Sequence, residues 1–340
     1  MSAKHPLRAS HRHVVTGAAD ITTDWLSVAL GEPVASFSLQ HEQANWSQHW
    51  PIAATLASGE RRALRLKLCL GDTFGPSELH YYTRDYVGLA DAPLPRCYQG
   101  CFEPGVGYHL LLEDLSATHT DARDLKPTLA YGLEVATLLG RLHAHHWQTQ
   151  AAPEPSVVDR YLAEAQPGLT VLHGLTGHDL TDAFGRLARQ MHQRWSDPAG
   201  MSLLHGDLNP TNILCPRAAQ GPICFIDRQP FDWSLTYGLA VADLAYLVAV
   251  WWPTESRSAW QWEVLRAWHT ALNQPSYRWE MAVADWQLSV LQCLCVPLEW
   301  CAKPDTALSM RWLWEAQLDR ILAAMTPTGA GLPPAPWPQE

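Results

Sequence analysis

The chain has 340 residues, of which 47% are hydrophobic and only 17% are charged, so it can bury a large core. Its formal net charge of −10 argues against a nucleic-acid partner or an anionic membrane surface, because both require a basic face. No apolar run approaches the roughly 18 residues of a membrane span, and residues 1–17 lack the apolar centre of a signal peptide. The eight cysteines show no C-x-x-C spacing. We expect a cytoplasmic globular protein with reduced core thiols and without a membrane partner.

The first third of the chain has the pattern of a small β-rich unit. We expect a helix over residues 24–30 that begins after Thr22 or Thr23 and ends at Gly31. Strands follow between residues 34 and 70. The last of them, over residues 63–70, alternates cleanly, with leucines on one face and Arg65, Lys67 and Cys69 on the other.

A helix that begins at Ser77 and a strand over residues 108–112 complete this unit, which we assign to residues 1–113. A second, mainly helical unit is predicted for residues 114–325, beginning with a long amphipathic helix over residues 128–147.

Within the second unit, residues 148–200 show only a loose pattern, whereas residues 239–325 are dominated by helical periodicity. Residues 326–340 are rich in proline and glycine and are predicted to form a disordered tail.

The most informative segment reads His-Gly-Asp-Leu-Asn-Pro-Thr-Asn over residues 205–212, and Asp227 follows at the end of an apolar run. This is the spacing of the kinase catalytic loop H-R-D-L-x-x-x-N and of its downstream metal-binding aspartate. Only the arginine of that pattern is replaced, by Gly206.

Two short apolar runs, residues 212–215 and 223–226, flank a segment with prolines and a glycine and predict an antiparallel hairpin. Such a hairpin brings Asn212 beside Asp227. Two oxygen ligands suit Mg²⁺, which takes its remaining ligands from phosphates and water. The alternative is a turn whose Asp and Asn side chains only cap backbone groups.

With these motifs the chain resembles the aminoglycoside phosphotransferase and choline kinase-like group of the protein-kinase-like superfamily, and within it the ecdysteroid-kinase-like branch most. The patterns H-G-D-x-x-x-x-N-I-L, I-D-x-Q and D-L-A-Y-L of that branch stand at residues 205–214, 226–229 and 243–247. The resemblance implies an α+β, bilobal protein-kinase-like fold with a small β-rich N-lobe and a larger, mainly helical C-lobe.

The resemblance also implies roles for single residues of the catalytic segment. Asp207 would orient the acceptor hydroxyl and accept its proton, and Asn212 and Asp227 would hold Mg²⁺. His205 would brace the loop backbone. Asp243 would hydrogen-bond the loop, or else serve only as a helix N-cap.

In the N-lobe, the resemblance makes Lys67 the lysine that contacts the α and β phosphates of ATP, with Glu78 as its partner. Glu113 and Leu115 would form the hinge whose backbone receives adenine.

The segment that should cover the phosphates reads Gln-Ala-Asn-Trp-Ser-Gln-His-Trp over residues 43–50 and contains no glycine, although the family tends to have small residues there. Asn45 and Ser47 could offer donors to phosphate. Trp46 and Trp50 would hinder the approach of the backbone, so an active kinase needs both indoles to turn away.

Seventeen tryptophans, many of them in the last third of the chain, are the compositional oddity. In the family the acceptor lies between the catalytic loop and the C-terminal helices. Aromatic walls with a carboxylate could hold an amphipathic alcohol, or an amino alcohol through cation-π contact. The candidates for this acceptor site are Trp251, Asp285, Glu299 and Trp300.

These features predict an ATP- and Mg²⁺-dependent kinase that phosphorylates a hydroxyl group of a small organic molecule, such as a natural-product alcohol or an antibiotic. The absence of D-F-G and A-P-E patterns and of the loop arginine disfavours a phosphorylation-controlled protein kinase. A choline or ethanolamine-type kinase, a nucleotidyl transferase and a non-catalytic, nucleotide-binding pseudokinase stay open as alternatives. The acceptor, the nucleotide preference and the oligomeric state stay open as well.

Overall fold

The computed structural model describes residues 13–43, 46–218, 221–231 and 234–326. The chain divides into two compact units, each of which takes up two stretches of the sequence. Unit 1 comprises residues 1–122 and 212–232, and unit 2 comprises residues 123–211 and 233–340. The predicted hairpin after the catalytic loop therefore belongs to unit 1, whereas the sequence pattern assigned it to the second unit. The predicted tail lies outside the described residues except for Thr326.

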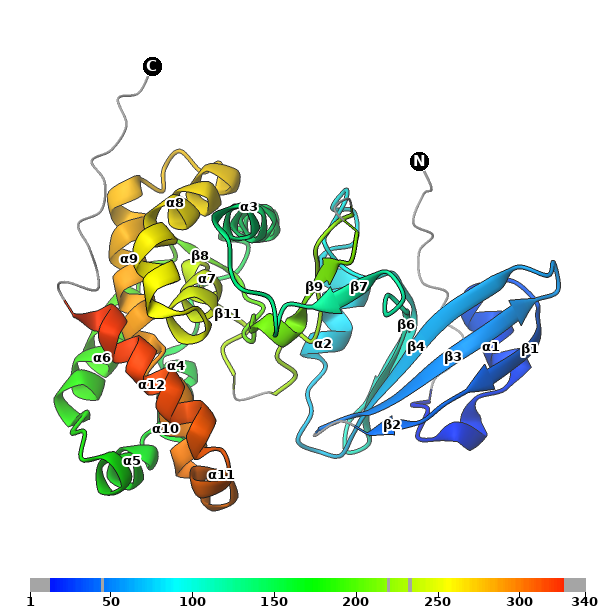
Figure 1. Ribbon diagram of the computed structural model, residues 1–340, viewed down its shortest axis with the longest axis horizontal. Coiled ribbons are helices and arrows are strands. Elements are labelled where there is room, and N and C mark those ends of the chain that lie inside the picture. The colour runs from blue at the N-terminus through cyan, green and yellow to red at the C-terminus, as the bar shows by residue number, and fades with distance from the viewer. Residues whose placement is uncertain (1–12, 44–45, 219–220, 232–233, 327–340) are drawn as a thin grey trace. The chain divides into compact units, whose positions relative to one another are not determined.

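A six-stranded antiparallel sheet forms the body of unit 1 (Figure 1). Its strands lie in the order β1 (Val34–Leu39), β3 (Gln48–Leu56), β4 (Arg61–Leu70), β6 (Gly107–Glu113) and β5 (Cys97–Glu103), with β2 (Glu42–Gln43) paired to β3.

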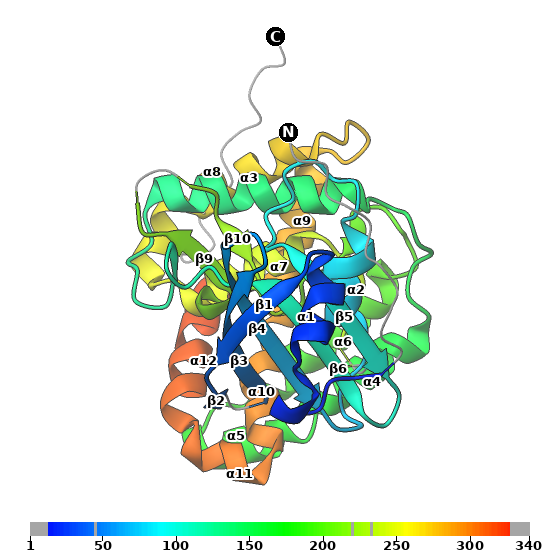
Figure 2. The same ribbon diagram turned by 90° about the vertical axis from the view of Figure 1, so that its right-hand side faces the viewer.

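The helix α1 (Thr23–Leu30) packs on one face of this sheet (Figure 2). As predicted, it is capped by Thr22, whose hydroxyl accepts a hydrogen bond from the Trp25 N–H, and it ends at Gly31 with a φ of 74°.

The strand β4 shows the predicted alternation. Leu64, Leu66 and Leu68 join the core beneath α1, and Trp50 of β3 packs against the same core. Because side chains alternate along a strand, Lys67 lies on the opposite face. We call these two faces of the sheet the α1 face and the lysine face.

Two smaller pieces complete unit 1. The helix α2 (Ser77–His80) continues into a π-helical turn, Tyr81–Asp85, and so confirms the helix predicted at Ser77. A three-stranded sheet has the order β10 (Cys224–Phe225), β9 (Ile213–Pro216) and β7 (His119–Asp121). The strands β9 and β10 form the predicted antiparallel hairpin.

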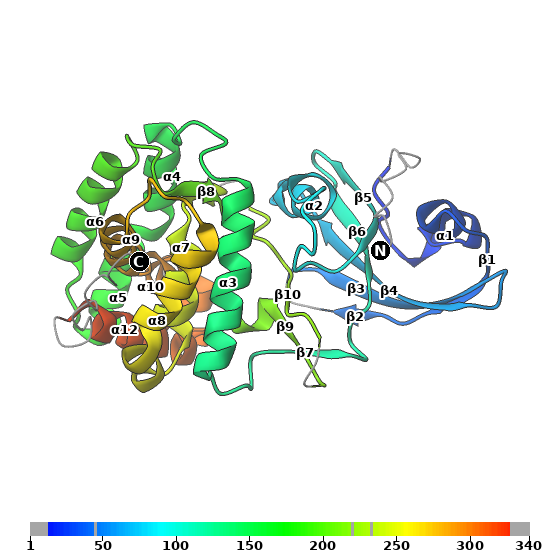
Figure 3. The same cartoon turned by 90° about the horizontal axis from the view of Figure 1, so that it is seen from above.

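Unit 2 is mainly helical. Its helix α3 (Leu129–His145) begins after the cap Thr128 and lies along α8 (Thr254–Leu272) (Figure 3). A two-stranded ladder joins β8 (Met201–Leu203) to β11 (Tyr237–Leu239). The helix α7 (Val241–Ala245) passes directly into a π-helical segment, Tyr246–Trp251. The remaining helices of the C-terminal part are α9 (Trp279–Gln292), α10 (Cys295–Ala302), α11 (Pro304–Ser309) and α12 (Arg311–Met325).

The loosely patterned region 148–200 contains three helices: α4 (Pro155–Ala165), α5 (Gly168–Thr176) and α6 (Thr181–Arg194). In α6 the residues that become buried are Phe184, Leu187 and Met191, which follow the spacing of one helix face.

One helical stretch, Trp279–Ala302, is long and apolar enough to cross a membrane, which corrects the expectation that no segment approaches that length. Of the most apolar 18 residues of this stretch, 78% are buried inside the protein. A core helix of a soluble protein passes the same test, so the apolar character of α9 and α10 is accounted for by packing in unit 2.

Candidate active site

The lysine face of unit 1 carries a buried cluster of opposite charges. The Lys67 ammonium lies 2.8 and 2.9 Å from the two carboxylate oxygens of Glu78 and 3.0 Å from Oδ1 of Asp227. Strand β4 supplies the lysine and α2 the glutamate, as the sequence predicted for this pair. The aspartate comes from a segment 160 residues away in the chain.

Burial governs the electrostatics of this cluster. Burial alone would lower the pKa of Lys67, but the carboxylates of Asp227 and Glu78 outweigh it and raise that pKa above its ordinary value. Burial also raises the pKa of Glu78, against the opposing effect of Lys67. The Tyr108 hydroxyl donates a further hydrogen bond to Glu78. A charged lysine is thus held in place beside two carboxyl groups.

The β9–β10 hairpin brings the two predicted metal ligands together. Ile213 pairs with Phe225, and the Ile226 N–H donates to the Asn212 carbonyl at 3.0 Å, so Asn212 lies beside the strand end that carries Asp227. Asp227 has a φ of 58°, a left-handed conformation that is uncommon for residues other than glycine and is often found at functional sites.

The donor set of this hairpin fits Mg²⁺, which binds through one or two protein oxygens and fills its shell with phosphate oxygens and water. Among the described residues no group of three or more His, Cys, Asp or Glu side chains could hold a metal ion. A closed all-protein metal cage is therefore not built into the described parts of the chain.

The segment after Asp227 is fixed to the helix that carries Glu78. Arg228 forms a buried ion pair with Asp85, with 2.9 Å between Nη1 and Oδ2. The Ser77 hydroxyl donates to the Gln229 carbonyl, and the Gly75 N–H donates to the Pro230 carbonyl at 2.7 Å. These bonds fix the backbone that follows Asp227 to the part of unit 1 that carries Glu78.

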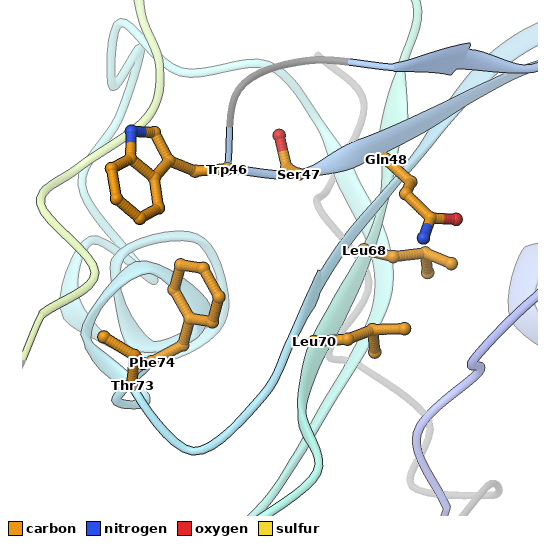
Figure 4. Close-up of a pocket in the computed structure, with 7 residues that line it drawn as sticks. All are labelled: Trp46, Ser47, Gln48, Leu68, Leu70, Thr73 and Phe74. Carbon is orange, nitrogen blue, oxygen red and sulfur yellow. The ribbon is translucent and has the colours of Figure 1, made fainter. Parts of the chain in front are cut away.

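Of the two indoles in the glycine-free segment 43–50, Trp50 turns away from the lysine face, whereas the exposed Trp46 points to the side of Phe74 (Figure 4). Trp50 packs on the α1 face and stacks against His41. The Trp46 ring is 61% exposed and meets Phe231 edge to face, with 5.9 Å between ring centres. Ser47 is buried, and its hydroxyl lies 2.8 Å from Nε2 of His49. The predicted phosphate contact Asn45 lies outside the described residues.

A pocket of about 330 Å³ lies next to this segment (Figure 4). Its walls are Trp46, Ser47, Gln48, Leu68, Leu70, Thr73 and Phe74. Gln48 and Leu68 face each other across β3 and β4, and in Figure 4 they lie on the same side of the strands as Leu70. All three alternate with the residues of the lysine face, so much of this pocket belongs to the other side of the sheet.

The predicted adenine hinge lies at the end of β6. Glu113 is the last residue of that strand, and its N–H donates to the Arg96 carbonyl at 2.8 Å. Leu115 begins a turn in which its carbonyl accepts hydrogen bonds from the N–H groups of Thr118 and His119. The contact of this backbone with adenine stays a prediction.

In unit 2, two side chains hold the predicted catalytic carboxylate. Oδ1 of Asp207 accepts hydrogen bonds from the Asn209 side-chain amide at 2.9 Å and from the Tyr246 hydroxyl at 3.0 Å. The Asp207 N–H points at Nδ1 of His205 at 3.4 Å, which fits a bracing role for that imidazole. The sequence did not single out Tyr246, although it stands in the D-L-A-Y-L motif.

Asp243 binds the backbone of the catalytic loop, as the resemblance implied. Its two carboxylate oxygens accept the N–H groups of His205 at 2.7 Å and of Gly206 at 2.8 Å. The N-cap of α7 is Ala240, with no side-chain cap bond, so the simple capping role is not seen. Gly206 has a φ of 79°, which favours glycine and gives a reason why no arginine stands there.

Asp243 also ends a chain of hydrogen-bonded side chains that was not predicted from the sequence. The Trp268 indole donates to Nδ1 of His143 at 3.0 Å, and Nε2 of His143 lies 3.1 Å from Oδ2 of Asp243. An indole N–H can only donate, so Nδ1 accepts and Nε2 carries the proton that is donated to Asp243. All three side chains are buried.

The predicted acceptor-site residues lie in different environments. Trp251 lies next to Tyr246, with 6.3 Å between ring centres, and is thereby close to the group that binds Asp207. Asp285 is buried and paired with Arg194 at 2.7 and 2.8 Å and with the Tyr277 hydroxyl at 2.7 Å. This pairing assigns Asp285 to the internal framework of unit 2 and corrects its proposed place in the acceptor site.

Glu299 and Trp300 both lie on α10 and are half-buried. The Glu299 carboxylate is 2.6 Å from the Lys303 ammonium, one turn further along the chain. Burial raises the pKa of Glu299 although Lys303 opposes this effect. Their part in acceptor binding stays a prediction.

Comparison with known proteins agrees with this geometry. A family model described as "phosphotransferase enzyme family" matches residues 76–282, more than half of the chain. No curated protein matches the chain.

Similar solved structures include a microcompartment-associated aminopropanol kinase, with 16% identity, a TM-score of 0.50 and coverage of 86% of this chain and 94% of that chain. An aminoglycoside-3'-phosphotransferase of type VIII has 19% identity and a TM-score of 0.48, covering 75% of this chain and 93% of that chain. The macrolide 2'-phosphotransferase MphH from Brachybacterium faecium has 16% identity and a TM-score of 0.48, with coverage of 90% and 96%. The first of these likenesses supports the kinase-like α+β fold.

Proposed function

Because the chain belongs to the phosphotransferase enzyme family, we propose that it transfers the γ-phosphoryl group of Mg·ATP to a hydroxyl group of a small organic molecule. The observation that carries this proposal is the buried Lys67, bonded at once to Glu78 and Asp227. A lysine held in this way offers a fixed positive charge to phosphate oxygens. The proposed setting for this reaction is the cytoplasm.

In this proposal each side chain of the site has one role. Asn212 and Asp227 hold Mg²⁺, which neutralises the charge that develops on the phosphates. Asp207 accepts the hydroxyl proton as the acceptor oxygen forms its bond to phosphorus and the bond to the departing ADP breaks. Asn209 and Tyr246 keep one oxygen of Asp207 in a fixed orientation.

The fixed position of Asp227 favours an enzyme that is competent without phosphorylation. Arg228 and the backbone of residues 229–230 are bonded to α2 and to the loop before it. A protein kinase uses a phosphorylated activation loop to order this region. Here the side chains and the backbone of unit 1 already do so.

The acceptor is proposed to be a hydroxyl-bearing small molecule that uses aromatic contacts near Trp251 and, on α10, near Trp300 and Glu299. An amino alcohol fits the acidic net charge of −10 and the aromatic side chains through cation-π contact. A choline or ethanolamine-type substrate belongs to the same chemical class and is one outcome of the test.

The test is a screen of amino alcohols, aminoglycosides, macrolides and other hydroxylated natural products with Mg·ATP, read by mass spectrometry. An acceptor that gains one phosphoryl group supports the proposal. A gain of one nucleotidyl group would assign the chain to nucleotidyl transfer. Binding of Mg·ATP by calorimetry without phosphorylation of any acceptor would favour the alternative of a non-catalytic, nucleotide-binding pseudokinase, and absence of both would overturn the proposal.

A further inference from the structure

His49 lies directly opposite Lys67 in the antiparallel register of β3 and β4. Its neighbours Gln48 and Trp50 lie on the α1 face. Gln48 lines the pocket of Figure 4, and Trp50 packs against the core. Side chains alternate along a strand, so His49 lies on the lysine face. The imidazole is thus close to the cluster of Lys67 and Asp227, and both charges act on it.

One nitrogen of this imidazole is bonded and the other is not. Nε2 lies 2.8 Å from the Ser47 hydroxyl. Nδ1 is buried, and no hydrogen-bond partner meets it among the parts of the chain that the structure describes. A buried polar atom without a partner is costly, so such an atom at a charged site points to a ligand.

The protonation state of the ring defines what that ligand can be. Burial, and after it the charge of Lys67, lower the pKa of His49 to about 4, so the ring is neutral at physiological pH. A neutral imidazole has one N–H. If the Ser47 hydroxyl donates to Nε2, the proton lies on Nδ1, which then becomes a donor on the lysine face. Phosphate oxygens are acceptors and suit this donor, whereas Mg²⁺ prefers oxygen ligands.

We propose that His49, oriented by Ser47, donates a hydrogen bond from Nδ1 to a phosphate oxygen of the nucleotide. This inference rests on the proposed function, because it assigns the nucleotide as the ligand. It gives the glycine-free segment a way to hold phosphate that needs no close approach of the backbone. A side-chain donor replaces the backbone donors that glycine-rich loops present.

The experiment compares His49→Leu, which removes both nitrogens, with His49→Asn, whose amide can reproduce the donor at Nδ1. Calorimetry measures the binding of Mg·ATP, Mg·ADP and adenosine to each variant. His49→Leu should weaken ATP binding by roughly tenfold or more, the effect of losing a hydrogen bond to a charged group. Adenosine carries no phosphate, so its affinity should not change. His49→Asn should bind ATP within about threefold of the parent, because the hydrogen-bond donor to phosphate is kept.

His41→Leu is the matched control, because His41 lies just before β2 and packs against Trp50, which lies on the α1 face. It should bind ATP like the parent. Ser47→Ala is a second variant that leaves the imidazole in place and removes only the group that sets its tautomer. It should weaken ATP binding less than His49→Leu.

The outcomes separate the two proposals. A parent that binds ATP while His49→Leu binds it equally well overturns the role of His49 and leaves the kinase proposal standing. Equal losses of ATP and adenosine affinity in His49→Leu also overturn it, because they indicate general damage to the unit. A parent that binds no adenine nucleotide overturns both.

Discussion

The hydroxyl oxygen of Tyr246 lies 3.0 Å from Oδ1 of Asp207. Burial raises the pKa of Tyr246 well above its ordinary value of 10, so the phenol stays protonated and donates this bond. Asp243, three residues earlier, holds the N–H groups of the same loop. One short helical segment therefore fixes both the backbone of the catalytic loop and its carboxylate.

Tyr246→Phe should lower kcat by about tenfold, the effect of one hydrogen bond to a charged group. The donor holds one carboxylate oxygen of Asp207 in place, so its loss should lower kcat and leave the affinity for Mg·ATP nearly unchanged. Tyr237→Phe is the control, because that hydroxyl bonds only backbone groups of Gln150 among the contacts described. Equal kcat values for Tyr246→Phe and the parent would contradict the role of this bond.

Lys67→Met should destabilise the protein by about 3–5 kcal/mol, because it leaves the fully buried Glu78 carboxylate without its charged partner. Adding Glu78→Gln removes one of those charges and keeps an acceptor for the Tyr108 hydroxyl, so the double variant should regain part of the lost unfolding free energy. Lys67→Met should also lose affinity for ATP, and the double variant should not recover that affinity. Chemical denaturation and calorimetry measure the two quantities separately, and a double variant that recovers nucleotide affinity would show that Lys67 is only structural.

The free energy of unfolding should depend on Asp243 at acid pH. Burial tends to raise the pKa of Asp243, but the hydrogen bonds from the His143 imidazole and the His205 N–H lower the pKa below its ordinary value of 3.8. A depressed folded-state pKa stabilises the protein above the unfolded-state value, and this stability is lost as the pH falls through the folded-state value.

The unfolding free energy of Asp243→Asn should therefore fall less steeply than that of the parent below pH 3.8. Denaturant titrations of both proteins across this range provide the measurement. Parallel slopes would exclude Asp243 as a source of the acid sensitivity.

Binding of Mg·ATP should alter the surroundings of Trp46, which lies in the glycine-free segment and meets Phe231 edge to face. Trp46→Phe should lose part of the fluorescence change that Mg·ATP produces in the parent. Trp312→Phe, which removes another exposed indole, should not. Saturating Mg·ATP should also raise the unfolding free energy of the parent by about 2.7 kcal/mol at a hundredfold excess over the dissociation constant. A flat melting temperature would contradict nucleotide binding in this segment.

Local patterns carried most of what could be predicted. The hairpin of Asn212 and Asp227 follows from two apolar runs and their turn residues, and the ion pair of Lys67 and Glu78, which the family resemblance implied, spans only eleven residues. Both depend on short-range spacing, which a sequence displays directly.

Long-range pairings could not be predicted in the same way. The bond of His143 to Asp243 joins residues 100 positions apart, and Arg194 reaches Asp285 over 91 positions. Without its partner, Asp285 resembled an acceptor-site carboxylate on a tryptophan-rich helix. The helix α6 could have been predicted, because Phe184, Leu187 and Met191 follow a helical period. The glycine and proline residues near α4 and α5 interrupt the pattern of the neighbouring sequence.

The central claim is that Asp207 acts on the acceptor hydroxyl while Asp227 acts on the metal-bound nucleotide. The direct measurement is phosphoryl transfer from Mg·ATP by Asp207→Asn, with calorimetric Mg·ATP affinity determined on the same preparation and with Asp227→Ala as the contrast. We predict that Asp207→Asn loses roughly 10²- to 10⁴-fold in rate, the contribution of a positioned base, and keeps its nucleotide affinity. Asp227→Ala should instead lose the Mg²⁺-dependent binding of ATP. Parental turnover in Asp207→Asn, or unchanged Mg·ATP affinity in Asp227→Ala, would contradict this division of roles.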